Sequence, residues 1–222
     1  MKMTSKFGII AIFLILIAFG IAPVVAGSGN YQSIQDINSA GANWVVQSVS
    51  AVQGGYINNE IITNDNTGDH VYQSVVASQS GGFKILFFVI PGSNLQSIAN
   101  VNDGKWVTQS VSAAQGGISN DQIINNLNNG NHVYESVVAS QNGLNNYQGI
   151  QNGNYDGNNV NQGIIASQDG ITNSQTVVNK NYGNNVYQGI IASQSGIDNT
   201  QGVQNVNNGG NSVIQTVYAV QG

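Results

Sequence analysis

One motif recurs along the chain at a nearly constant interval. It reads VYQGIIASQSG at residues 186–196, and seven related copies occur. The first Gln of each copy, or the Glu that replaces it, is Gln47, Gln73, Gln109, Glu135, Gln162, Gln188 and Gln215. The steps between these positions are 26, 36, 26, 27, 26 and 27 residues. A fixed period of this length is typical of solenoids and other stacked repeats, so the repeat limits the possible folds more than any single residue does.

The composition allows two interpretations of such a repeat. Only 7% of the residues are charged, and there is no Cys. A polar but uncharged chain is either a disordered low-complexity tract or stacked β-structure with ladders of side-chain amides. The regularly placed Val and Ile residues favour stacked β-structure, because a disordered chain has no need of periodic β-branched residues.

The N-terminus has the pattern of a targeting segment. Lys2 and Lys6 precede an apolar run from Phe7 to Val25, which ends in small residues at Ala26. This pattern predicts a secretory signal peptide over residues 1–26, and an uncleaved membrane anchor is the alternative. We therefore expect a secreted protein, extracellular or at the cell surface, that meets a membrane only through this segment before cleavage. The mature chain is acidic and has no basic patch, which argues against nucleic acid as a partner.

Each repeat contains two strand-like halves. In the second half, apolar and amide residues alternate, as in Val186, Gln188, Ile190, Ala192 and Gln194, and this alternation places them on one face of a strand. The last Gln of this face is Gln53, Gln79, Gln115, Gln141, Gln168, Gln194 and Gln221 in the seven copies. The first half supplies an Asn in every copy: Asn30, Asn58, Asn94, Asn120, Asn146, Asn173 and Asn199. The pattern predicts an all-β fold, a two-sheet parallel β-solenoid with seven strand-turn-strand rungs over residues 27–222.

We expect the uniform face to point inward, because a stacked interior must repeat its shape at every rung. In register, each inward amide can bond the same amide of the next rung, about 4.8 Å away, so the Gln and Asn residues form stacking ladders. The reverse arrangement, with amides outside and aromatic residues inside, is the alternative. On the variable face, one outward column is expected to hold Trp44, Tyr72, Trp106, Tyr134, Asn161, Tyr187 and Ile214.

The amide and glycine skeleton resembles a known repeat. Gln168-x-Gly170-x-x-Asn173-x-Gln175-x-x-x-Asn179 is similar to the curlin repeat, Gln-x-Gly-x-Gly-Asn-x-Ala-x-x-x-Gln, and the resemblance covers residues 28–222. Curlins are secreted subunits of extracellular amyloid fibres, in which each repeat is one strand-turn-strand rung. The resemblance implies a fibre-forming protein whose partners are further copies of itself, a secretion channel and a nucleator subunit. The present repeats are longer than those of curlins, and Gln stands where curlins often have Ala.

Residues 83–92, FKILFFVIPG, interrupt the period between the second and third copies. They are the most apolar part of the chain after the N-terminal segment. Two interpretations are open: a loop folded over the side of the solenoid, or an exposed apolar hook for contact between fibres or with a membrane.

Three carboxylates interrupt otherwise uniform amide positions. Glu60 and Glu135 replace Gln, and Asp36 replaces Asn. Because a buried carboxylate must pair, become protonated or distort its rung, these residues are candidate gatekeepers that slow premature stacking. The alternative, which the sequence favours slightly, is simple tolerance near an exposed edge. His70 and His132 occupy equivalent positions and are interpreted as solvated turn residues in preference to a metal pair.

The sequence contains no catalytic constellation, phosphate-binding loop or calcium-repeat spacing, so we expect neither an enzyme nor a cofactor. The leading hypothesis is a secreted structural protein that self-assembles into extracellular amyloid-like fibres for a matrix, adhesion, a biofilm or a sheath. The repeat pattern runs to Gln221 without a capping segment, and an uncapped strand edge can pair with another subunit. The alternative is a monomeric cell-surface adhesin or binding solenoid.

Overall fold

The structure is a computed structural model that describes residues 30–55, 57–85, 88–155 and 157–222. Within these residues every regular element is a β-strand. The strands are β1 (Asn30–Gly55), β2 (Ile57–Ile85), β3 (Phe88–Pro91), β4 (Ser93–Asp103), β5 (Trp106–Asn129), β6 (His132–Asn154), β7 (Asn159–Asp169), β8 (Thr172–Asn181), β9 (Val186–Ser195), β10 (Asp198–Asn207) and β11 (Val213–Gln221). The longest of them, such as β5 and β6, run through a corner of the coil and contribute to both sheets.

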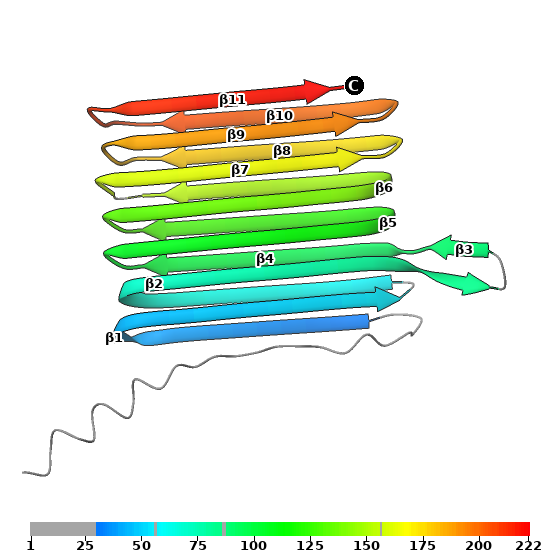
Figure 1. The fold of residues 1–222 in the computed structure, drawn as a ribbon, viewed down its shortest axis with the longest axis horizontal. Helices are drawn as coiled ribbons and strands as arrows, with labels where there is room; N and C mark the ends of the chain where they lie inside the picture. Colours follow the sequence, from blue (N-terminus) through cyan, green and yellow to red (C-terminus); the bar gives the residue numbers. More distant parts are fainter. Residues whose placement is uncertain (1–29, 56, 86–87, 156) are drawn as a thin grey trace, which may run out of the picture.

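The strands stack as a two-sheet solenoid (Figure 1). The first half of each repeat pairs in parallel with the first half of the next, in the order β1, β2, β4, β5, β6, β8 and β10. The second halves form the other sheet, in the order β1, β2, β5, β6, β7, β9 and β11. The register aligns identical motif positions, with Gln47 beside Gln73 and Gln188 beside Gln215. The predicted all-β parallel solenoid is therefore confirmed.

The interior of the solenoid lies between the two sheets and is narrow. Its centre is a stack of aliphatic side chains, including Ile62, Ile98 and Ile124 from the first sheet and Val75 and Ala77 from the second. A second apolar stack consists of Val45, Val71, Val107, Val133, Val160 and Val186. Inward and outward residues alternate along nearly every interior strand. The uniform face thus points inward, as predicted, and buries both its aliphatic and its amide side chains.

Glycine at the corners allows the backbone of successive rungs to approach closely. A Cβ atom on Gly143, Gly170 or Gly196 would collide with the carbonyl oxygen of the corresponding glycine one rung earlier. No larger residue fits there without moving the backbone, because the backbone atoms of parallel rungs are only about 4.8 Å apart. The glycine in the Gln-x-Gly-x-x-Asn skeleton therefore has a steric role in the stacking.

The insertion at residues 83–92 contributes to a β-hairpin. The end of β2 pairs antiparallel with β3, from Gly82 opposite Pro91 to Ile85 opposite Phe88. Figure 1 shows this hairpin extending beyond the end of the stacked strands. Its backbone does not fold over the side of the solenoid, so the first of the two interpretations is wrong.

The predicted signal peptide at residues 1–26 lies outside the described residues. Among the residues that are described, no helix is long and apolar enough to cross a membrane.

Candidate functional site: amide ladders and the terminal rung

The inward Gln residues form continuous hydrogen-bonded ladders. In the second sheet, Gln168 Nε2 donates to Gln141 Oε1 at 2.7 Å, and Gln141 Nε2 donates to Gln115 Oε1 at 2.8 Å. The same donation links Gln194 to Gln168 at 2.7 Å and Gln221 to Gln194 at 3.1 Å. In each case the amide of the later rung donates to the oxygen of the earlier rung. The Gln ladders therefore have a uniform direction.

The second hydrogen of each of these amides is donated across the turn to a backbone oxygen of the other sheet. Gln141 Nε2 also donates to the backbone oxygen of Tyr147 at 2.8 Å, and Gln168 Nε2 donates to that of Ser174 at 3.1 Å. Each acceptor lies six residues further on, in the other sheet. Both hydrogens of the amide are thus used, which offsets the desolvation of a buried polar group.

The Asn ladders have the opposite direction. Asn94 Nδ2 donates to Asn120 Oδ1 at 2.8 Å, and Asn120 Nδ2 donates to Asn146 Oδ1 at 2.8 Å. The donation continues to Asn173 and then to Asn199, each at 2.8 Å. Here the earlier rung donates to the later one. The two kinds of amide ladder therefore run antiparallel along the stacking axis.

Of the predicted ladder residues whose side chains are described, all those in interior rungs are buried. In the last rung, Gln215 and Gln221 are exposed and Asn199 is half-buried, yet each bonds the preceding rung. The backbone of Asn30 pairs with that of Asn58, as the register predicts. The sequence therefore placed these residues in the correct columns.

Three further inward columns were not predicted as ladders. Their amide members with described side chains are Gln32, Gln96, Gln122, Gln148, Gln175 and Gln201; Asn64, Asn100, Asn126, Asn152, Asn179 and Asn205; and Asn66, Asn102, Asn128, Asn154, Asn181 and Asn207. In the first, for example, Gln148 Nε2 donates to Gln122 Oε1 at 2.8 Å. The third bridges the sheets, since Asn128 Nδ2 donates to Gln109 Oε1 at 3.0 Å. All three columns can be found in the sequence. They lie on the alternate residues that follow the predicted Asn in each first half, as in Asn120, Gln122, Asn126 and Asn128.

The three carboxyl groups lie inside these columns. Glu60 and Glu135 are 0% and 1% exposed in interior rungs, and Asp36 is 5% exposed in the first rung. Tolerance near an exposed edge is therefore the wrong explanation for the two glutamates. Burial raises the pKa of Glu60 to about 7 and that of Glu135 to about 8, against smaller opposing effects of the Gln96 and Gln162 amides. Burial also raises the pKa of Asp36.

The last rung exposes the positions that interior rungs bury. Val217 in β11 is 48% exposed, whereas Ile190, one rung earlier in the same column, is 0% exposed. Val213 is 38% exposed, whereas Val186 in its column is 0% exposed. β11 pairs with β9 along one edge, and no described strand pairs with its other edge. This surface is a cross-section of the solenoid interior.

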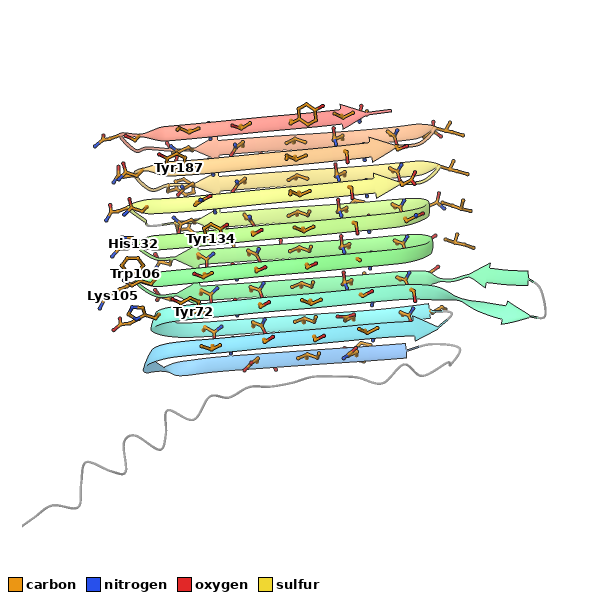
Figure 2. All side chains as sticks on the ribbon, in the orientation of Figure 1. Tyr72, Lys105, Trp106, His132, Tyr134 and Tyr187 are labelled. Atoms are coloured by element: carbon orange, nitrogen blue, oxygen red, sulfur yellow. The ribbon has the colours of Figure 1, made fainter. Side chains whose placement is uncertain are left out.

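The aromatic residues of the predicted outward column occupy two columns, so the prediction of a single column is wrong. Trp44 and Trp106 align with His70 and His132, two residues before the column that holds Tyr72, Tyr134 and Tyr187. The Trp106 ring stacks between the two imidazoles, with centroid distances of 6.4 Å to His70 and 3.8 Å to His132. Figure 2 shows Trp106, His132 and the three tyrosines at the same end of the stacked strands. The alignment of the repeats by sequence placed Trp44 and Trp106 two residues out of register, and this merged two separate columns into one.

No group of three or more His, Asp or Glu side chains that could hold a metal ion occurs in the part of the chain that the structure describes. Comparison with known proteins found no family model, no curated protein and no solved structure that matches this chain. The resemblance to the curlin repeat therefore depends on the sequence skeleton alone.

Proposed function

We propose that this protein is a secreted structural subunit that assembles head to tail into extracellular amyloid-like fibres. The observation that supports the proposal most directly is the exposed interior face of β11. Val213, Gln215, Val217, Ala219 and Gln221 continue the columns that are buried in earlier rungs. A further rung on this surface would bury Val213 and Val217, at about 25 cal/mol for each Å² of apolar surface removed from water.

The hydrogen-bonding direction of the ladders fits the same arrangement. Because Gln215 and Gln221 donate to the preceding rung, their Oε1 atoms are left to accept from a following one. In the first rung, Gln47 and Gln53 accept from the second rung. The Gln53 amide gives one hydrogen to the backbone oxygen of Asn59, which leaves the other as a donor for an incoming surface. Head-to-tail stacking therefore brings donors to acceptors. A contact between two different ends does not close on itself, so it produces filaments.

The proposal is tested by a charge on the exposed interior face. Val217→Asp places a carboxylate on a surface that solvent reaches in the single chain and that stacking would bury. Thr216→Asp is the matched control, because Thr216 neighbours Val217 in β11 on the outward side of the sheet. We expect Thr216→Asp to elongate in a seeded thioflavin assay and Val217→Asp to remain unextended. We also expect a small fraction of Val217→Asp to shorten wild-type fibres, because it can join a growing end and then block it.

Two results would contradict the proposal. One is equal elongation of the two variants. The other is a wild-type protein that stays monomeric at high concentration, which would favour the monomeric adhesin.

A further inference from the structure

The three buried carboxyl groups interrupt ladders whose donor direction is uniform elsewhere. A Gln side chain in these ladders accepts on its oxygen and donates from its nitrogen, on opposite sides of its rung. A carboxylate at the same position can only accept. Its column therefore contains two acceptor oxygens where an oxygen and an N–H group should meet.

Glu135 shows the interruption from both sides. On the side of the later rung, Gln162 Nε2 donates to Glu135 Oε2 at 3.0 Å, as the ladder requires. On the side of the earlier rung, Glu135 Oε1 is buried without a hydrogen-bond partner. The group that it should donate to is Gln109 Oε1. This oxygen accepts from Asn128 in the other sheet, but it lacks the second donor, from the later rung, that Gln73 Oε1 has.

Glu60 and Asp36 interrupt two amide columns of the first sheet. The Gln column there donates to the earlier rung, so Glu60 should donate to Gln32, and Gln32 Oε1 is buried without a partner. The Asn column donates to the later rung, so Asp36 should donate to Asn64. Asn64 Oδ1 and Asp36 Oδ2 are both buried without a partner. At Asp36 the unpartnered oxygens lie on the side that the ladder direction predicts. Around Glu60 the column is interrupted on both sides, because both carboxyl oxygens and Gln96 Nε2 are buried without a partner as well.

We infer that Asp36, Glu60 and Glu135 are protonated when the rungs are stacked, and that the carboxyl O–H of each replaces the missing amide N–H. The carbonyl oxygen of the acid still accepts along the column, as Glu135 Oε2 does from Gln162. Each protonated acid thereby reproduces the donor and acceptor arrangement of the Gln or Asn that it replaces. Stacking of this chain then takes up protons, whether or not chains associate with one another.

The surroundings of the three groups contain no compensating positive charge among the described residues. Lys105 is exposed, where it pairs with Asp69, and Lys180 is on the outward side of β8. On the strands packed against the three groups, the acidic and histidine side chains that point outward are Asp65, Asp69, His70, Asp103, Asp121, His132 and Asp169. Asp36 and Glu60 both lie in the interior of the first two rungs, and the column of Ile34 and Ile62 separates them. Neighbouring carboxyl groups favour the neutral form of each other.

The pH range follows from the pKa of each glutamate in its two states. An unstacked Glu ionises near its ordinary pKa of 4.5, whereas burial holds the pKa at about 7 for Glu60 and about 8 for Glu135. The protonated form of each glutamate therefore stabilises the fold in full below pH 4.5. This stabilisation is lost as the pH rises through about 7 for Glu60 and through about 8 for Glu135. From pH 5 to pH 9 the folding equilibrium constant should fall by roughly two to three orders of magnitude for each glutamate.

Infrared spectroscopy of the wild-type protein at pH 6 tests the protonation directly. Exposed carboxyl groups are ionised at this pH, so we expect the C=O stretch of an un-ionised carboxylic acid to remain from the buried groups. Glu135→Gln and Glu60→Gln should each remove part of this band, while Asp103→Asn, at an exposed position of β4, should leave it unchanged.

Denaturant unfolding at pH 5 and pH 9 provides the second measurement. The wild type should lose stability at the higher pH, and the Glu60→Gln/Glu135→Gln double variant should lose much less, because an amide supplies the donor at every pH. The inference would be overturned if the folded wild-type protein at pH 6 showed only carboxylate bands and no carboxylic acid band. A double variant as sensitive to pH as the wild type would overturn it as well. Neither measurement requires fibres, so failure here is distinct from failure of the proposed function.

Discussion

At the scale of the residue, the amides of the unbroken ladder from Gln53 to Gln221 are stabilising because each has a partner in the adjacent rung. Gln141 takes part in three hydrogen bonds: it donates to Gln115 and to the backbone of Tyr147, and it accepts from Gln168. Isolated from such partners, a buried amide would cost about 1–3 kcal/mol. The ladder converts a residue type that is usually exposed into one that specifies the register, because a slip of one residue would break every column at once.

Replacing Gln141 by Leu should destabilise the fold. The substitution leaves Gln115 Oε1, Gln168 Nε2 and the Tyr147 carbonyl without their partner, at a cost of about 3 kcal/mol or more in the free energy of unfolding. Ser140→Ala, at the neighbouring outward position, is the control and should change stability by less than about 0.5 kcal/mol. Denaturant unfolding of the two variants makes the comparison. Equal stability would indicate that the amides do not carry the stacking.

Residue identity in the sequence was enough to place part of this interior. Gln141 and Asn146 recur in every copy, and their equivalence predicted two of the ladders. The columns through Gln122 and Asn126 were recognised only as amide positions that Glu60 and Asp36 interrupt, and they were not predicted to form ladders. The direction of donation could not be predicted at all, since an amide presents its oxygen and nitrogen equally well to either side and only the packing of the whole rung selects one.

At the scale of the element, the hairpin of β2 and β3 is an addition to a corner of the coil. It accounts for the one long step of the repeat, 36 residues between Gln73 and Gln109, where the other steps are 26 or 27. Gly81 and Gly92 stand close together at its base, since a Cβ atom on Gly81 would lie 3.0 Å from the carbonyl carbon of Gly92. The sequence located the interruption, but its antiparallel pairing depends on cross-strand contacts that the repeat pattern does not encode.

Deletion of residues 82–91 should leave the solenoid intact. The deletion removes ten residues and restores a step of 26, because 36 − 10 = 26. Joining Gly81 to Gly92 requires little backbone movement, so we expect unchanged β-sheet content and a change in stability below about 1 kcal/mol. Removal of ten residues from within β7, 160–169, is the control that should disrupt a rung. Circular dichroism and denaturant unfolding report both results, and loss of the fold on hairpin deletion would show that the hairpin supports the coil.

At the scale of the whole molecule, the same interactions that join one rung to the next can join one chain to the next. The period predicted the parallel stacking, because only like halves placed over like halves align the Gln and Asn positions. What the structure adds is the antiparallel direction of the Gln and Asn ladders and the exposed cross-section at β11. In the proposed fibre, this cross-section of one chain would meet the first rung of the next.

Fibre diffraction combined with electron microscopy of the purified protein tests the central claim most directly. If chains continue the stack head to tail, concentrated protein should form unbranched fibres, and aligned fibres should give a meridional reflection at about 4.8 Å, the spacing between strands. A protein that sediments as a monomer at every concentration, and gives no such reflection, would contradict the account.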